Sequence, residues 1–240
     1  MRRLSYSIFL LAASAAFGTA AQAGLCDAAF MHDGGQTQLT GSGALAMSAN
    51  LAFSQVRKNA GDSCEARVTG DTSVGLLGLP ASQTKLDYWM TVRNGKATFE
   101  RREANGTRTP VNGKFDLRML GLFSYGDPIK REGQTFPALR FQINLDRQAV
   151  QADPLVVQTG SKTVGQRQSI QTAAGAQSCW PIRYTRSIDP TRASINGLTL
   201  PIPGMTSSVT DWFCPAQNMV MKQESVQNGM TSVVEVTKIK

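Results

Sequence analysis

The sequence predicts a mainly β protein: a single antiparallel, twisted sheet that curls into an open barrel or half-barrel, with an apolar concave face and little helix. Three observations lead to this class. Polarity alternates with a period of two along several segments, and Asn-Gly pairs follow or separate such segments. No convincing helical spacing of apolar residues occurs after the first 23 residues.

The chain begins with the features of a cleavable export signal. Arg2-Arg3 form a positively charged start, residues 8–13 begin an apolar core, and Ala21-Gln22-Ala23 is a small-x-small cleavage site. Residues 1–23 are therefore predicted to be a signal peptide that is removed. Residues 24–240 are predicted to form one β-rich domain. The mature protein of a Gram-negative bacterium would then lie in the periplasm or be secreted.

A lipoprotein signal is the alternative, because Cys26 lies just beyond the cleavage site. However, Leu25 directly precedes it, where lipoprotein signals have a small residue. No later segment approaches the ~20 apolar residues of a membrane-spanning helix, so none is expected in the mature chain.

The net charge of the chain is +8, and it falls to +6 when the two signal arginines are removed. A moderate basic excess suits contact with anionic surfaces such as lipid head groups. The charges are scattered, however, and adjacent basic residues in the mature chain occur only as the pairs Arg57-Lys58, Arg101-Arg102 and Lys130-Arg131. The sequence therefore gives no indication of nucleic-acid binding.

Alternating polarity predicts the individual strands. Apolar residues occupy every second position over four segments, at or near residues 45–53, 86–92, 115–119 and 139–145. Asp-Pro pairs separate later segments, and a short helix is expected near residues 147–153. Residues 200–204 (LPIPG) are predicted to form an exposed loop.

Two Asn-Gly pairs predict hairpins with defined registers. A type I′ turn at Asn94-Gly95 pairs the flanking residues as follows: Arg93 with Lys96, Val92 with Ala97 and Met90 with Phe99. A turn at Asn228-Gly229 pairs the last two strands as follows: Met221 with Val236 and Lys222 with Glu235. Asn112-Gly113 and Asn196-Gly197 mark further turns.

Four cysteines lie in the mature chain, and an even number in an exported protein indicates disulfides. Three connectivities are possible. We favour Cys26–Cys64 and Cys179–Cys214, because each pairs neighbours along the chain. Each bond would close a loop of under 40 residues and stabilise the fold by ~4 kcal/mol in the chain-entropy model.

The sequence contains few candidates for catalysis. His32 is the only histidine, and the residues after it read as a turn, so an exposed loop histidine is expected rather than a catalytic base. Metalloprotease, phosphate-binding and dinucleotide-binding motifs do not occur. We therefore predict no metal, no cofactor and no catalytic residue.

Aromatic residues adjoin two of the cysteines. Trp180 follows Cys179, and Trp212-Phe213 precede Cys214. They are interpreted in two ways: as an aromatic brace over a disulfide, or as an apolar ligand wall formed by Trp180, Trp212 and Phe213.

The C-terminal third resembles a known family. Residues 174–182 (AGAQSCWPI) are similar to a recurring segment AGTFxAxxI. Residues 210–215 (TDWFCP), followed by residues 219–222 (MVMK), are similar to TxWYAPGVGLVK. Together they resemble the TapB-like family of exported bacterial proteins of unknown function. The resemblance implies a curved antiparallel sheet like the lipoprotein-carrier half-barrels, and it implies no catalytic residues.

Departures from the family pattern are informative. Cys179 and Cys214 replace small residues of the family, and their joint replacement supports a bond between them. The position of the family lysine holds Met221, and Lys222 follows one residue later. A role for that lysine is therefore not carried over.

Three functions follow as hypotheses. The first is a non-enzymatic envelope protein that binds an apolar or lipid-like ligand, or an envelope partner protein, on its curved sheet. The second is a structural or adhesive accessory factor at the cell surface that acts through strand edges. The third is a histidine-independent hydrolase that uses carboxylates.

Overall fold

The fold was analysed in a computed structural model, which describes residues 24–240 except 43–44, 60–62, 77–78, 94–95, 111–124, 126–128, 144–149, 153–154 and 196–197. The predicted signal peptide and the predicted strand around residues 115–119 lie outside the described residues. In the described part, regular structure consists of strands and one 3-10 turn, η1 (Leu25–Asp27). No helix there is long and apolar enough to cross a membrane.

The strands follow the chain in this order: β1 (Gln36–Ser42), β2 (Leu45–Asn59), β3 (Ser63–Leu76), β4 (Leu79–Arg93), β5 (Lys96–Arg102), β6 (Arg108–Pro110), β7 (Thr135–Phe136), β8 (Leu139–Ile143), β9 (Val150–Ala152), β10 (Leu155–Thr159), β11 (Lys162–Val164), β12 (Gln168–Thr172), β13 (Gly175–Ile188), β14 (Thr191–Ile195), β15 (Leu198–Ile202), β16 (Met205–Cys214), β17 (Met219–Gln227) and β18 (Met230–Ile239).

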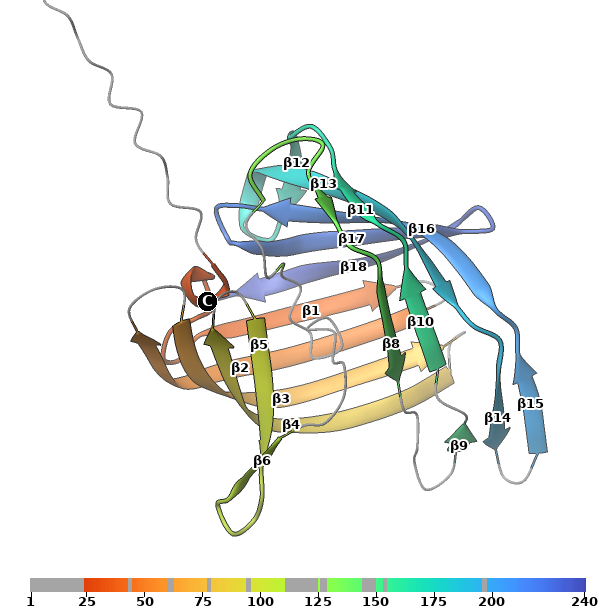
Figure 1. The fold of residues 1–240 in the computed structure, drawn as a ribbon, viewed down its shortest axis with the longest axis horizontal. Helices are drawn as coiled ribbons and strands as arrows, with labels where there is room; N and C mark the ends of the chain where they lie inside the picture. The colour runs from red at the N-terminus through yellow and green to blue at the C-terminus, as the bar shows by residue number, and fades with distance from the viewer. Residues whose placement is uncertain are drawn as a thin grey trace, which may run out of the picture.

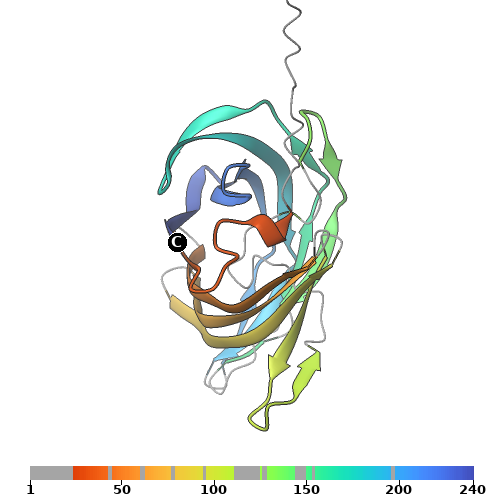
Figure 2. The ribbon, with the colours of Figure 1, turned by 90° about the vertical axis from the view of Figure 1, so that its left-hand side faces the viewer.

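Most strands belong to one 15-stranded sheet. Its main path is β6-β5-β4-β3-β2-β1-β18-β17-β16-β13-β10-β8, and β7, β11 and β12 pair at its side. A separate three-stranded sheet has the order β15-β14-β9. The large sheet curls so that β8 and β10 pass in front of the long strands β1–β4 (Figure 1), and the end view shows the curvature (Figure 2). The predicted antiparallel sheet, curled into an open half-barrel, is confirmed.

The two ends of the described chain meet within the sheet. β1 lies between β2 and β18, so the first strand pairs with the last. Gln36 and Lys240 donate backbone hydrogen bonds to each other's carbonyl oxygens, both at 2.9 Å.

Alternation along the strands separates buried from exposed side chains. In β4, every second residue is buried, and none of these is more than 6% exposed: Leu86, Tyr88, Met90 and Val92. In β2, Ala49, Leu51 and Phe53 are buried in the same way. β8 forms at the predicted position, but Leu139 is 45% exposed because β8 is the end strand of the sheet path.

The predicted hairpin registers largely agree with the structure. The strands β4 and β5 pair Arg93 with Lys96, and they also form the two predicted apolar pairs, Val92 with Ala97 and Met90 with Phe99. Asn94-Gly95 themselves lie outside the described residues. β17 and β18 pair Lys222 with Glu235 around a turn whose residues have positive φ, 50° at Asn228 and 78° at Gly229. The predicted pair of Met221 with Val236 is not among the paired positions, although both residues are buried.

Two local predictions were wrong. The short helix expected near residues 147–153 is a strand where it is described, because Val150–Ala152 (β9) pair with β14. The exposed loop expected at residues 200–204 begins as part of β15, which pairs with β14. Proline is tolerated in β15 because this strand lies at the edge of its sheet.

Both disulfides are the predicted ones. Cys26 bonds to Cys64 on β3, across a sequence separation of 38, and Cys179 on β13 bonds to Cys214 on β16, across a separation of 35. All four cysteines are buried. The second bond joins neighbouring strands, whereas the first ties the N-terminal segment to the sheet.

The N-terminal segment fills one end of the half-barrel. Figure 2 shows η1 and the residues after it inside the curl of the sheet. Leu25, Phe30 and Met31 are each 1% exposed and belong to one apolar cluster with residues of β2, β3, β4 and β17. We call residues 24–35 the plug. A second cluster, which includes Trp180 and Phe213, lies beyond it along the same strands.

Candidate functional site

The three residues predicted as a ligand wall lie on neighbouring strands but not on one surface. Trp180 of β13 is opposite Phe213 of β16, and both are buried. Trp212 occupies the alternate side of β16, where it is only half-buried. Trp180 and Phe213 therefore share the concave face, whereas Trp212 lies on the other face of β16. Ligand binding at these three residues stays a prediction.

The concave face is identified by what packs on it. Trp180 and Phe213 belong to the second apolar cluster together with Leu39 and Ala49 of β1 and β2. Along β2, Ala49 is followed on the same face by Phe53, which packs against the plug. The aromatic pair and the plug thus occupy the same curved surface.

The half-buried Trp212 side chain lies on the opposite face of β16 from Phe213 and packs against the cluster that contains the second disulfide. Its Nε1 donates a hydrogen bond to Glu224 Oε2 at 3.1 Å, and Lys222 Nζ lies 2.6 Å from the other carboxylate oxygen. Burial alone would raise the pKa of Glu224, but the hydrogen bonds from Lys222 and Trp212 together lower it. This group is a partly exposed ion pair on the sheet.

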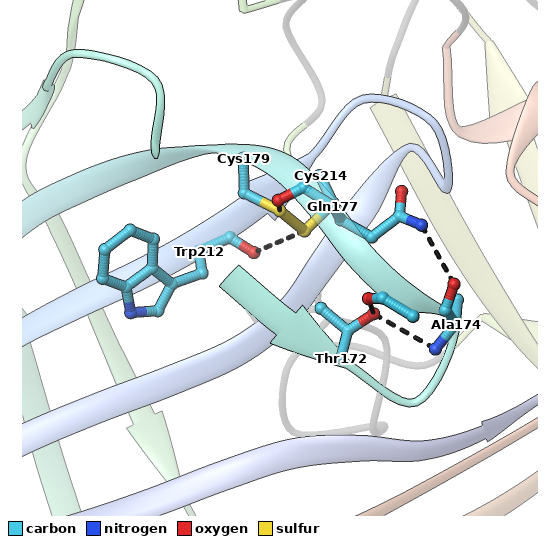
Figure 3. The surroundings of a disulfide bond; sticks show 7 residues. Thr172, Ala174, Gln177, Cys179, Trp212 and Cys214 are labelled. Atoms are coloured by element: carbon cyan, nitrogen blue, oxygen red, sulfur yellow. Dashed lines mark hydrogen bonds between the residues drawn. A yellow bond between two sulfur atoms is a disulfide. The ribbon is translucent and has the colours of Figure 1, made fainter. Parts of the chain in front are cut away.

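The surroundings of the second disulfide do not show an indole stacked on the bond. Figure 3 shows the Trp212 indole pointing away from the sulfur atoms, and its backbone carbonyl oxygen lies 3.7 Å from Cys214 Sγ. Ala174 of the β12–β13 turn and Trp212 both pack against the cluster that contains the bond. The interpretation of Trp212 as an aromatic brace over the disulfide stays a prediction.

A buried polar cluster lies next to the aromatic pair. Asp211 is fully buried, and Gln223 and Tyr184 are 4% and 6% exposed. Asp211 Oδ1 accepts hydrogen bonds from Gln223 Nε2 at 2.6 Å and from the Tyr184 hydroxyl at 3.3 Å. Gln223 Nε2 also donates to the Tyr184 hydroxyl oxygen at 3.3 Å. A carboxylate in such a setting is stabilised by its donors rather than by water.

Tyr125 connects this polar cluster to the aromatic rings. Its hydroxyl donates a hydrogen bond of 2.6 Å to Asp211 Oδ2. Its ring lies 5.0 Å from that of Phe136 and meets Phe213 edge-on at 6.2 Å, both between centroids. One face of the half-barrel therefore carries aromatic rings and a buried carboxylate side by side.

A buried cation completes the cluster. Lys162 is 3% exposed, and its Nζ lies 4.7 Å from the Tyr184 ring centroid and 5.2 Å from that of Tyr125. Positions over aromatic faces stabilise a cation by cation–π attraction. Lysine and aspartate are rarely this deeply buried, and such groups are enriched at functional sites.

The sequence positions these groups through strand alternation. Val209, Asp211 and Phe213 fall on one side of β16, so the aspartate replaces an apolar residue at an inward position. β17 places Gln223 directly opposite Asp211. Sequence reasoning missed the cluster, although an acidic residue in phase with buried neighbours was a signal that could have found Asp211.

The indole of Trp180 adds a further polar group on this side of the sheet. Its Nε1 is buried and has no hydrogen-bond partner in the described part of the chain. The guanidinium carbon of Arg167, an exposed residue, lies 4.4 Å from the centroid of the same ring. A buried donor without an acceptor is uncommon in folded proteins.

His32 is the remaining residue that the sequence offered for catalysis. His32 is exposed at the end of the plug, with Nδ1 3.0 Å from the backbone oxygen of Asp33. Within the described ranges, no group of three or more His, Cys, Asp or Glu side chains is arranged to hold a metal ion. Asp211, the tyrosines, Gln223 and Lys162 instead offer charge and hydrogen bonds to a polar group, beside rings that suit an apolar one.

Comparisons with known proteins give distant structural likenesses. No family model matches the chain, and no curated protein matches it by sequence. A provisionally assigned exported protein with a YmcC-like fold from Bacteroides fragilis is 12% identical, with a TM-score of 0.47 over 87% of this chain and 96% of that chain. A provisionally assigned lipoprotein from Parabacteroides distasonis is 14% identical, with a TM-score of 0.48 over 89% and 98% of the two chains.

The hypothetical lipoprotein YmcC from Escherichia coli is 8% identical, with a TM-score of 0.36 over 88% of this chain and 86% of that chain. Likenesses at this level carry no inference about the activity of the present chain. The resemblance to the TapB-like family is not supported by a matching family model and stays a prediction.

Proposed function

We propose that the chain is an exported, non-enzymatic protein of the bacterial cell envelope that binds an amphipathic, lipid-like ligand on the concave face of its half-barrel. The observation that carries the proposal is the buried cluster of Asp211, Lys162 and Tyr184 beside the aromatic pair. Sites for amphipathic molecules combine an apolar lining with a few convergent polar groups.

Export is supported by the chemistry of the chain. Arg2-Arg3, the apolar segment after them and a small-x-small site resemble a signal peptide. Two disulfides join all four cysteines, and disulfides persist in oxidising compartments such as the periplasm. An envelope protein is also surrounded by lipids, which makes them available as ligands.

The roles within the site follow from the contacts. Trp180 and Phe213 supply the apolar wall, and Trp180 Nε1 supplies a donor that lacks an acceptor in the described part of the chain. Tyr125 lies between the wall and the carboxylate, so it contacts both portions of a bound amphipathic molecule. Asp211 and Lys162 orient the polar portion.

The test uses the different placement of two tryptophans. A variant with Trp89→Phe and Trp212→Phe retains only Trp180, and a variant with Trp89→Phe and Trp180→Phe retains only Trp212. Each is mixed with vesicles or micelles of a lipid brominated on its acyl chain, which quenches nearby indole fluorescence. We expect quenching of Trp180 and little change at Trp212, which lies on the other side of β16.

A second measurement addresses the natural ligand. The protein purified from the envelope of its host is analysed by native mass spectrometry and by lipid extraction, and a co-purified lipid is expected. Equal or absent quenching of the two tryptophans, together with an empty purified protein, would contradict the proposal.

A further inference from the structure

The plug occupies its place mainly through side-chain burial. Leu25, Phe30 and Met31 are each 1% exposed, and the Phe30 ring lies 4.7 Å from that of Phe53, between centroids. Figure 2 shows this segment enclosed by the curl of the sheet. These side chains therefore fill the interior of the half-barrel in the way that an apolar ligand would.

Hydrogen bonds join the plug to the rest of the described chain mainly at its two ends. Of residues 25–32, only Ala29 donates a backbone hydrogen bond to another described segment, to the Gln217 oxygen at 3.4 Å. At one end, the Asn218 amide donates to the Gly24 oxygen. At the other end, Gly34 donates to the Phe53 oxygen at 3.0 Å, and Phe53 donates to the Gly35 oxygen at 2.8 Å. The Val56 backbone N–H also donates to Asp33 Oδ1 at 2.8 Å. By contrast, β1 is paired along most of its length on both sides.

One covalent bond ties the start of this segment to the sheet. Cys26 lies in η1, and its partner Cys64 lies on β3, beneath the plug and 1% exposed. The bond holds η1 against the concave face. Of residues 25–32, only Ala29 adds a backbone hydrogen bond to another described segment. Loss of this bond removes the covalent constraint on the segment, while the sheet pairing of β3 stays in place.

The surface under the plug continues into the candidate site. Along β2, Ala49 belongs to the cluster with Trp180, and Phe53 on the same face belongs to the plug cluster. Along β18, Val234 and Val236 are divided between the clusters in the same way. A hydrocarbon chain that begins beside Trp180 reaches the plug without leaving the concave face.

We propose that the plug is releasable, that the Cys26–Cys64 disulfide is its latch, and that the surface it covers takes the hydrocarbon portion of the ligand. The latch opens by thiol–disulfide exchange with an external dithiol. The dithiol loses two electrons and two protons and becomes a disulfide, and Cys26 and Cys64 gain them as two thiols. Only the identity of the occupant rests on the proposed function.

Two single-cysteine replacements test the latch. Cys26→Ser leaves the Cys64 thiol under the plug, and Cys179→Ser leaves the Cys214 thiol, which is equally buried but lies between two sheet strands. Mass spectrometry first verifies that the other disulfide is intact in each variant. The rate of maleimide labelling is then measured on the folded proteins. We expect Cys64 to react about tenfold faster or more than Cys214, because the plug is unlatched only in the Cys26→Ser variant, and Cys214, although it lies in the same apolar cluster, stays covered while the latch is intact.

Equal labelling rates of Cys64 and Cys214, whether slow or at the rate of global unfolding, would contradict the proposal that the disulfide is a latch. If either variant fails to fold, the unmodified protein is treated with increasing dithiothreitol and alkylated. Modification of Cys26 and Cys64 before Cys179 and Cys214 supports the latch, and simultaneous or reversed modification overturns it.

Occupancy is tested separately with cis-parinaric acid, a fluorescent fatty acid. Replacing both cysteines of the latch by serine is expected to tighten its binding about tenfold relative to the unmodified protein, because the plug no longer competes. Fast Cys64 labelling without this gain would confirm release but refute a hydrocarbon occupant. Quenching of Trp180 without labelling of Cys64 would retain the proposed function and refute the latch.

Discussion

Replacement of Asp211 by alanine tests how much the buried polar cluster stabilises the fold. The carboxylate accepts hydrogen bonds from Tyr125 and Gln223 at 2.6 Å each, and from Tyr184 at 3.3 Å. Alanine removes all three acceptor positions. Gln223 Nε2 still donates to the Tyr184 hydroxyl oxygen at 3.3 Å, whereas the Tyr125 and Tyr184 hydroxyls both lose Asp211 as their acceptor.

The expected magnitude follows from those two donors. A buried polar group that loses its partner costs about 1–3 kcal/mol. We therefore expect Asp211→Ala to lower the free energy of unfolding by about 2–5 kcal/mol, a large part of the total for an ordinary domain. Asp211→Asn keeps one acceptor oxygen but loses the charge and replaces the other oxygen by an NH2 group, from which the Tyr125 hydroxyl can accept, so its loss is expected to be about 1–2 kcal/mol.

Urea unfolding followed by far-UV circular dichroism measures these losses. Asp189→Ala is the matched control: Asp189 also accepts from a glutamine, Gln158, at 2.8 and 3.1 Å, but its side chain is 36% exposed. Its loss is expected to be at most about 1 kcal/mol. If the two alanine variants lose the same stability, the cluster is not the buried network described above.

Two further predictions concern the β2–β4 region. The pKa of Asp87 is lowered, chiefly by the hydrogen bond from Arg67, against an opposing effect of burial. Its stabilisation is therefore complete above the ordinary value of 3.8 and lost as the pH falls through the lowered value. Because both groups are partly exposed, Asp87→Asn should lose at most about 1 kcal/mol at neutral pH, and this difference should vanish in acid urea titrations. A Cβ at Gly70 would lie 1.9 Å from the Asn50 carbonyl oxygen, so Gly70→Ala should cost about 3 kcal/mol or more. Gly106→Ala, with no atom within 4 Å of the added Cβ, should cost about 1 kcal/mol for its positive φ; similar losses in thermal unfolding would refute the steric argument.

Strands were predictable where local pattern and burial agree. In residues 86–92 every second side chain is apolar, and each of these is buried on the concave face. A two-residue turn permits one register, so Asn94-Gly95 fixed the pairing of β4 with β5. The disulfides were predictable because each joins cysteines that are neighbours along the chain.

The plug and the polar cluster were not predictable, because distant segments create them. Residues 24–35 have no period of two or of helix type, and their burial depends on the sheet that surrounds them. Asp211 receives its bond from Tyr125, which is 86 residues away. A single sequence contains no signal for such a pairing. β9 was mistaken for a helix for the same reason, since its partner β14 lies some 40 residues farther on.

The pairing of β1 with β18 has a consequence for how the protein folds. A chain that is synthesised or translocated from its N-terminus presents β1 early, yet one side of β1 has its partner only in the last ten-residue strand. Contacts so distant in sequence form slowly, because the loop between them must first be closed. Half-completed chains thus hold an unpaired strand in the middle of the future sheet. Such an intermediate leaves one edge of β1 open to chaperones or to other chains until β18 is added.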